Sequence, residues 1–501
     1  MSQLNPSFDI FSRDSLHYRT VPVTEVFHSD TLTPIQMFAS LKNEAVFLLE
    51  SKAFHDPSIR YSFIGLNPFF EMEEKSGRFL LKDLTFHTIS ESRSLKEGVQ
   101  SISDKLKVKT PDLPVPFTGG GVGYVSYEAV TDFEQIILKP SADQPRYHLL
   151  FCETILVFDH LEQSVTIIHF VRINSEKNDG TLREIYDDAR TKIEGIKRRI
   201  QIRINVDDLM LYPEDYDPES LNMQSNYEKS DFIKDVEKIK AYIHAGDIFQ
   251  AVLSQRFRKR VSISGFELYR VLRQVNPSPY LFYLNYRNRE VVGSSPERFI
   301  QVSHGLIEMH PIAGTRRRGK SRDEDDRIAK QLLADEKERA EHYMLVDLAR
   351  NDVGKVSEFG SVHVPEQLQI NYFSHVMHIV SKVRGTLRSD LHPIDAFVAA
   401  FPAGTLTGAP KIRAMEIIEE LEPQARGVYG GAIVYFGFDG NIDSCITIRT
   451  ATIQDQVIHI QAGAGIVADS DPEKEYQETI NKANGLFYSV LLAEQSQLKR
   501  V

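Results

Sequence analysis

A polar, acidic stretch divides the chain into two unequal parts. Residues 205–226, "NVDDLMLYPEDYDPESLNMQSN", are rich in Asp and Glu and carry Pro213 and Pro218. Prolines and clustered polar residues interrupt helices and strands, so this stretch is predicted to be a linker. It separates an N-terminal lobe, residues 1–204, from a C-terminal domain, residues 227–495.

The hydrophobic periodicity indicates both helices and strands in each part. Short apolar runs such as "AVFLLES" and "TILVFDH" read as strands, whereas "SLKEGVQSISDKLKV" spaces its apolar side chains at helical intervals. Beyond the linker, a helix starting near Phe232 is expected to stop at Gly246, and strands and helices then alternate to about residue 495. The expected fold class is α+β, a large composite of two lobes in which antiparallel β-sheets are flanked by helices.

Composition restricts the class of function. The chain has 501 residues, 42% of them hydrophobic, and a formal net charge of -11, which disfavours nucleic acid as the main partner. The basic run Arg316 to Lys320 is followed directly by acidic residues and is expected to form a solvated loop. No window approaches the roughly 20 apolar residues of a membrane span, and the first residues do not resemble a signal peptide, so a cytoplasmic location is expected. Cys152 and Cys445 lie in apolar runs and are expected to be buried thiols.

One predicted helix places acidic side chains where apolar ones are expected. In residues 335–354, Glu338 and Glu341 continue the stripe of Leu345 and Leu348. Two like charges in a shielded position repel each other unless a cation neutralises them.

A second helix repeats the spacing. Asp471 is placed to cap it, Glu475 and Glu478 project from one face, and Lys482 lies one turn further on. Two such pairs could hold a hard divalent ion, with Mg²⁺ the natural choice. An isolated Glu-x-x-Glu pair is more often a solvated helix face, and the register of the first pair favours the metal.

The strand before this second helix ends in Gly463, Ala464 and Gly465, whose backbone N–H groups can approach an anion closely. The same residues fit a dinucleotide fingerprint formally, but the acidic strand expected about 20 residues later is absent. "AGTLTGAPK" likewise lacks the spacing of a phosphate loop.

Three further residues are candidate binding groups. In "DSCITIRTATI" strand alternation would place Arg449 on a face with Cys445 and Ala451, where it could pair with a structural carboxylate or clamp a substrate carboxylate. His378 and Tyr429 are weaker candidates, because a lone His is more often a satisfied structural group and a Tyr beside glycines is often a packing residue.

A family resemblance connects these pieces. "DIFQAVLSQRF", "GSSPERF", "HPIAGTRRRG", "AEHYMLVDLARNDVG", "SHVMHIVSKVRG", "FPAGTLTGAPK", "GVYGGAIVYF" and "QAGAGIVADSDPEKEYQETINKA" closely resemble the chorismate-binding domain of the anthranilate synthase large subunit. The match spans about residues 228–490, and "FLLES" and "RYSFIG" extend it to the N-terminal lobe. The resemblance makes residues 227–495 the catalytic domain and residues 1–204 the regulatory lobe.

The resemblance implies a reaction and assigns roles by position. Ammonia adds to chorismate as the ring hydroxyl departs, and loss of pyruvate then gives anthranilate, the first step of tryptophan biosynthesis. Glu297 would be the general acid, His378 would serve pyruvate elimination, and Thr405 would line the pocket. Mg²⁺ would lie between Glu338, Glu341, Glu475 and Glu478. The positions that match chorismate-binding residues are Gly314, Thr315, Tyr429, Arg449, Gly463, Ala464, Gly465 and Lys482.

Two positions separate this reaction from sister reactions. Isochorismate and salicylate synthases resemble the chain but carry a lysine base at the position of Gln250, and common aminodeoxychorismate synthases carry a nucleophilic lysine at the position of Ala313. Both differences favour direct attack by ammonia. Aminodeoxychorismate synthase component I, of the folate branch, remains the alternative because some relatives differ at Ala313.

The resemblance also implies partners. The sequence contains no recognisable glutaminase signature, so a separate glutamine amidotransferase subunit is expected to supply ammonia. Tryptophan is expected to be a feedback inhibitor, since a second set of residues resembles the tryptophan site of inhibited relatives. That set is Leu49, Glu50, Ser51, Pro279, Tyr280 and Leu281. A non-catalytic amino-acid sensor that uses only this second site is a hypothesis from a different class.

Overall fold

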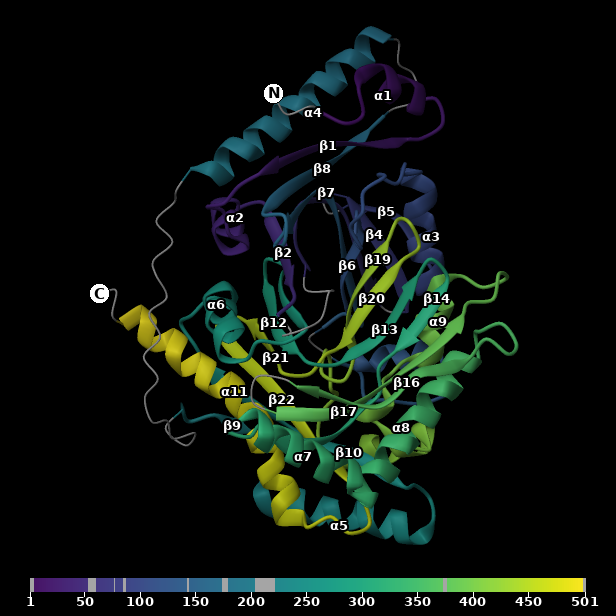
Figure 1. Cartoon of the computed structure of the whole chain (residues 1–501), viewed down its shortest axis with the longest axis vertical. Coiled ribbons are helices and arrows are strands. Elements are labelled where there is room, and N and C mark those ends of the chain that lie inside the picture. Colours follow the sequence, from purple (N-terminus) through teal and green to yellow (C-terminus); the bar gives the residue numbers. More distant parts are fainter. Residues whose placement is uncertain are drawn as a thin grey trace.

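The computed structural model describes residues 4–52, 60–75, 77–83, 87–141, 144–173, 179–202, 221–372 and 376–498 (Figure 1). Most of the predicted linker, residues 205–220, therefore lies outside the described residues. The molecule is elongated. Helices α1 (Phe8–Asp14) and α4 (Asp179–Gln201) cover one end, and α5 (Lys229–Ala245) lies at the other (Figure 1).

Antiparallel pairing dominates the architecture. Within the described residues 22 strands join into one sheet system, and every strand pair in it is antiparallel. The strands are β1 (Thr20–His28), β2 (Ala45–Glu50), β3 (Tyr61–Lys75), β4 (Arg78–Asp83), β5 (Thr88–Ser92), β6 (Gly120–Val125), β7 (Tyr147–Asp159), β8 (Ser164–Arg172), β9 (Gln224–Ser225), β10 (Gln250–Arg260), β11 (Tyr280–Asn285), β12 (Arg289–Ser295), β13 (Arg298–Ser303), β14 (Leu306–Met309), β15 (Ile312–Arg317), β16 (His363–Tyr372), β17 (Val376–Thr386), β18 (Gly408–Ala409), β19 (Ala432–Gly437), β20 (Ile442–Ile446), β21 (Thr450–Gln454) and β22 (Val457–Ile466).

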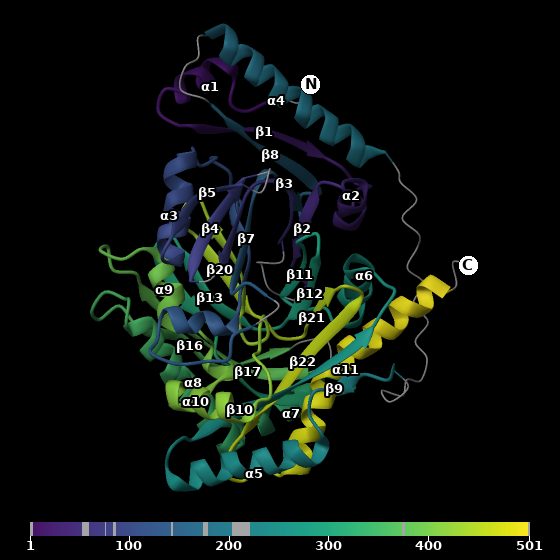
Figure 2. The ribbon, with the colours of Figure 1, turned by 180° about the vertical axis from the view of Figure 1, so that it is seen from behind.

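Helices pack around this sheet system, which confirms the α+β prediction. Beside α1, α4 and α5 they are α2 (Pro34–Ser40), α3 (Leu95–Leu106), α6 (Gly265–Val275), α7 (Arg322–Ala334), α8 (Glu336–Gly354), α9 (Pro393–Ala400), α10 (Lys411–Leu421) and α11 (Pro472–Leu498), with 3-10 turns η2 (Tyr127–Asp132) and η4 (Gly404–Leu406). From behind, α11 is seen to run along β22 (Figure 2).

Local sequence signals set several helix ends. Asp335 caps α8 by accepting hydrogen bonds from two backbone N–H groups of the first turn, and Asp471 does the same for α11. Gly246 ends α5 with φ of 85°, a left-handed conformation that glycine adopts without strain. The predicted cap at Asp471 and the predicted stop at Gly246 are confirmed.

The two parts of the chain share sheets and cores. β2 pairs with β11, where Glu50 lies opposite Leu281, and β6 pairs with β19. β9, inside the predicted linker, pairs with β10. Both large buried apolar clusters draw side chains from before and after the linker. The division into residues 1–204 and 227–495 stays a prediction about chain organisation.

No helix in the described part of the chain is long and apolar enough to cross a membrane. Cys152 and Cys445 are buried and unpaired, as predicted.

Candidate active site

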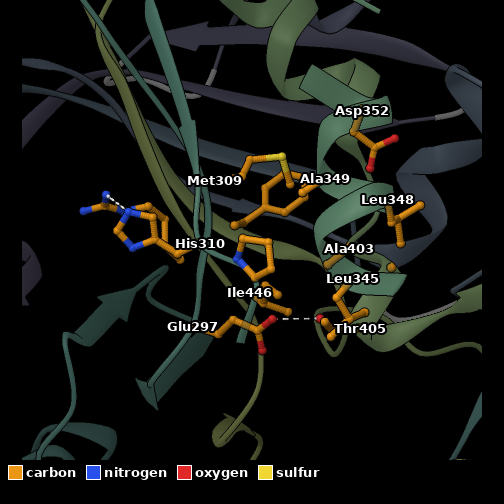
Figure 3. Close-up of a pocket in the computed structure, with 14 residues that line it drawn as sticks. Glu297, Met309, His310, Leu345, Leu348, Ala349, Asp352, Ala403, Thr405 and Ile446 are labelled. Carbon is orange, nitrogen blue, oxygen red and sulfur yellow. Dashed lines mark hydrogen bonds between the residues drawn. The ribbon is translucent and has the colours of Figure 1, made fainter. Parts of the chain in front are cut away.

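Glu297 and Thr405 meet at the rim of a small cavity of about 40 Å³ (Figure 3). Glu297 lies between β12 and β13, and Thr405 lies in η4. The Thr405 hydroxyl donates a hydrogen bond of 2.9 Å to Oε1 of Glu297. Burial raises the pKa of the Glu297 carboxyl to about 7, although the Thr405 bond and the charge of Lys482 act in the opposite direction. A carboxyl group with such a pKa holds a proton that it can give away near neutral pH.

The walls of this cavity explain the raised pKa. Leu345, Leu348 and Ala349 reach it from α8, and Met309 and Ile446 reach it from strands on the other side (Figure 3). These side chains offer no hydrogen bond to an ionised carboxylate, so they favour the neutral acid.

The predicted acidic helix face is present. In α8, Leu345 is buried and Glu338 and Glu341 are half-buried. In α11, Glu475 is half-buried whereas Glu478 is exposed. The two acidic faces lie within electrostatic reach of each other, because the charge of Glu478 contributes to the raised pKa of Glu341.

Like charges perturb these glutamates. Burial first, and then the neighbouring Glu338, raises the pKa of Glu341; burial and Glu478 do the same for Glu475. Excess negative charge and purely oxygen donors fit Mg²⁺. The side chains do not form a complete coordination site, since among the described residues no group of three Asp, Glu, His or Cys side chains is placed to hold a metal ion.

Two cations already contact the outer glutamates. Arg316 donates to Glu338 at 2.7 Å, and Lys482 lies 2.7 Å from Glu478. The expectation of a solvated loop at residues 316–320 is therefore wrong for its first two residues, since β15 extends to Arg317. Arg316 belongs to β15, and its side chain reaches Glu338 of α8.

His378 is held in a defined tautomer. Its Nδ1 lies 2.9 Å from the carbonyl oxygen of Gly314 and 3.1 Å from the hydroxyl of Thr315. A carbonyl oxygen only accepts, so Nδ1 carries the proton and Nε2 is the basic nitrogen. Burial lowers the pKa of His378 and keeps the ring neutral. Gly314 is the extra residue of a bulge in β15, with φ of 67°, and the bulge presents its carbonyl oxygen to His378. A Cβ added to Gly314 would lie 3.1 Å from the Glu338 carboxylate.

Arg449 does not lie on a strand, so that part of the prediction is wrong. β20 ends at Ile446 and β21 begins at Thr450, and Arg449 joins them with φ of 50°. The chain turns there because β20 pairs with β13 and β19 whereas β21 pairs with β12 and β22. The guanidinium donates to the carbonyl of Lys482, and no described carboxylate forms an ion pair with it. It can therefore receive a substrate carboxylate.

The predicted glycine segment lies in β22. Gly463, Ala464 and Gly465 pair with β10 on one side, whereas β21 pairs with β22 only as far as Ile460. Lys482 donates to the carbonyl of Gly463 at 3.0 Å. A Cβ on Gly463 would lie 2.7 Å from the hydroxyl of Tyr429, so a larger residue there would displace that buried side chain.

The two discriminating positions are both buried. Gln250 begins β10, and its Nε2 would lie 2.6 Å from a Cβ on Gly465. Ala313 lies in β15 beside the bulge.

The residues of the second predicted site line one cavity of about 910 Å³. They are Leu49, Glu50, Ser51, Pro279, Tyr280 and Leu281. The pairing of β2 with β11 brings them together. Glu50 is buried and accepts hydrogen bonds from Tyr269 at 2.6 Å and Arg273 at 3.0 Å.

Sequence reasoning missed the polar wall of this larger cavity. Arg298, Glu308, His310 and Asp443 line it together with the predicted residues. These residues come from β13, β14, the connection that follows β14, and β20, so only the folded sheet brings them together.

The fold and the site define a class of protein. Residues 47–488 match the family described as chorismate binding enzyme, and the chain belongs to that family. It is therefore an enzyme of the chorismate-utilising class.

Curated relatives narrow the comparison. "Anthranilate synthase component 1" of Bacillus subtilis (strain 168) is 50% identical over 97% of this chain and 95% of its own length. The protein of the same name from Aquifex aeolicus (strain VF5) is 41% identical over 99% of both chains.

Solved structures agree. Anthranilate synthase component I from Streptococcus pneumoniae TIGR4 superposes with a TM-score of 0.74 at 34% identity, covering 92% of this chain and 98% of that one. The menaquinone-specific isochorismate synthase of Escherichia coli superposes with a TM-score of 0.67 at 19% identity, which supports the shared fold alone.

Proposed function

We propose that the chain is anthranilate synthase component I, a lyase that converts chorismate and ammonia to anthranilate and pyruvate in the first step of tryptophan biosynthesis. The observation that carries the proposal is the Glu297 carboxyl group, with a pKa of about 7, beside Thr405 in a largely apolar cavity. Such an acid can protonate a departing hydroxyl group at neutral pH, so that it leaves as water while ammonia adds to the ring. The names of the relatives support the same reaction.

The chain's own cations would bind the dianionic substrate. Arg449 and Lys482 flank the open edge of β22, where Gly463 and Gly465 keep side chains out of the way. A guanidinium binds a carboxylate through two parallel hydrogen bonds, which fixes orientation as well as charge.

Glu338, Glu341, Glu475 and Glu478 would hold Mg²⁺. The ion would neutralise these carboxylates and bind a carboxylate of the substrate. The raised pKa values of Glu341 and Glu475 are consistent with this assignment, because burial first and then neighbouring carboxylates disfavour their ionised forms, which a bound cation would stabilise.

His378 is proposed to act in the second half of the reaction. With Nδ1–H held by Gly314, Nε2 can take a ring proton as the ether bond to the enolpyruvyl group breaks. Pyruvate leaves and the ring becomes aromatic. Gln250 supports amination over hydration, since its amide cannot deprotonate water.

Ammonia is proposed to come from a glutamine amidotransferase subunit, and tryptophan is proposed to inhibit by binding in the cavity at Ser51. The large volume of this cavity and its mixed apolar and charged lining suit an aromatic amino acid. A cytoplasmic location fits a chain whose two cysteines are both unpaired.

One assay tests the proposal. The purified chain is incubated with chorismate, MgCl₂ and an ammonium salt, and anthranilate is followed by its fluorescence. We expect Mg²⁺-dependent formation of anthranilate and pyruvate in equal amounts. Accumulation of 4-amino-4-deoxychorismate would instead identify the folate-branch reaction, and unchanged chorismate would contradict both.

A further inference from the structure

The two cavities share a wall at the beginning of β13. Ser51 and Tyr280 line the larger cavity, and Glu297 lines the smaller one. Arg298 and His310 line both. A group that touches both cavities can respond to an occupant of one and affect the other.

Arg298 is the centre of a buried polar network on this wall. Its Nε donates to the hydroxyl of Tyr280 at 2.8 Å, and its Nη1 donates to Glu308 at 2.8 Å. The Tyr280 hydroxyl in turn donates to Asp443 at 3.0 Å. The Arg298 side chain is only 11% exposed, so these hydrogen bonds form in a low-dielectric environment where they restrict its position strongly.

Glu297 directly precedes Arg298 in the sequence, so the two residues share a peptide bond. The Glu297 carboxyl group accepts the hydrogen bond from Thr405 at the smaller cavity, whereas Arg298, the first residue of β13, donates to Tyr280 at the larger one. The pairing of β13 with β20 shifts register just after Arg298, so the strand is irregular at this point. In the described part of the chain, the hydrogen bond from Thr405 is the one recorded for the Glu297 carboxylate. The orientation of the Glu297 carboxylate therefore depends on the position of the backbone at the start of β13, which the hydrogen bonds of Arg298 hold in place.

We propose that Arg298 is the positioning residue for Glu297 and the residue through which an amino acid in the larger cavity weakens catalysis. This inference rests on the proposed function. The α-carboxylate of the amino acid would compete with Tyr280 and Glu308 for the guanidinium, since a guanidinium binds carboxylates in a bidentate manner. Movement of Arg298 would carry the start of β13 with it and take Glu297 away from Thr405. Coupling of this kind is reciprocal, so chorismate would weaken tryptophan binding by the same factor.

The main variant is Arg298→Lys, which keeps the positive charge but cannot donate to Tyr280 and Glu308 in the same fork. Tyr280→Phe is the second variant, because it removes a single hydroxyl and is the milder test if Arg298→Lys folds poorly. The matched control is Arg384→Lys. Arg384 also donates to Glu308, but it lines neither cavity and is distant in sequence from Glu297.

Tryptophan binding is measured by calorimetry with and without chorismate, and inhibition is expressed relative to each variant's own uninhibited rate. Typical coupling changes affinity by roughly 5- to 150-fold. We expect this factor to fall toward unity in Arg298→Lys and Tyr280→Phe, and to stay at the wild-type value in Arg384→Lys. The pH midpoint of kcat/KM for chorismate should also move in Arg298→Lys, because a displaced Glu297 no longer receives the Thr405 hydrogen bond.

Folded Arg298→Lys and Tyr280→Phe enzymes with the wild-type coupling factor and pH profile would overturn the inference. A wild-type enzyme that makes anthranilate without any response to tryptophan would overturn it too, while leaving the activity intact. Failure of the wild-type enzyme to make anthranilate would contradict the proposed function itself.

Discussion

Thr405 donates a hydrogen bond of 2.9 Å to the carboxyl group of Glu297, two residues that are far apart in the sequence. The bond stabilises the ionised carboxylate, whereas burial of Glu297 disfavours it, and burial is the larger effect. The balance leaves an acid that is half protonated near neutral pH.

Glu297→Gln should lower kcat by roughly 100-fold or more, the usual contribution of a general acid. The amide keeps the size of the side chain but cannot release a proton to the departing hydroxyl. Steady-state anthranilate formation measures the effect, and calorimetric chorismate affinity should change little. A rate within a few-fold of wild type would rule out the acid role.

The rate should fall as pH rises above about 7, because Glu297 donates only in its protonated form and its pKa is about 7. Thr405→Val removes a hydrogen bond to the ionised form, so the pKa should rise and the alkaline limb of kcat/KM should move to higher pH. Profiles of the two enzymes, recorded in matched buffers, test the sign. A shift to lower pH would contradict this account of the pair.

Glu341→Gln should weaken Mg²⁺ binding and Mg²⁺-dependent turnover by more than roughly tenfold, since it removes one anionic ligand from a small ion. Glu336→Gln is the matched control, because Glu336 lies exposed at the start of the same helix. Titration calorimetry with Mg²⁺ in the presence of chorismate measures binding directly. Equal affinities in the two variants would remove Glu341 from the site.

His378→Ala should slow pyruvate release more than amination. The lost Nε2 base serves only the step in which the ring proton leaves. Chromatography of reaction mixtures should show an amino-substituted intermediate that still carries the enolpyruvyl group. Chorismate consumption that fails altogether, with no intermediate, would count against this division of labour.

Ser51→Phe should relieve tryptophan inhibition while leaving turnover in its absence near the wild-type rate. Ser51 lies on the wall of the larger cavity, and a phenyl ring would occupy space that the inhibitor needs. Ser51→Ala, which adds no volume, is the control and should remain inhibited by tryptophan. An unchanged inhibition curve for the phenylalanine variant would place the inhibitor elsewhere.

Features encoded by neighbouring residues were predictable from the sequence. The acidic face of α8, the caps at Asp335 and Asp471, and the stop at Gly246 depend on spacings of three or four residues and on local hydrogen bonds. Some residues that carry the family resemblance also meet in the structure, since Thr315 contacts His378 and Thr405 contacts Glu297.

Features that depend on distant strand partners were not predictable. Alternation in "DSCITIRTATI" is the same whether the chain continues as one strand or turns, and the exchange of partners between β20 and β21 places Arg449 in a turn. Arg316 and Arg298 likewise carry no local signal of their roles. Each receives its role from a carboxylate or hydroxyl supplied by another element.

The pairing of β2 with β11, which places Glu50 opposite Leu281, has a consequence for folding kinetics. Contacts between segments so far apart in sequence require a long loop to close, which costs conformational entropy before the contacts contribute stability. Chains rich in such contacts fold slowly. Because this pairing builds the cavity at Ser51, that cavity cannot form within an N-terminal fragment that lacks β11. A newly synthesised chain therefore completes the proposed inhibitor cavity only after this long-range pairing has formed.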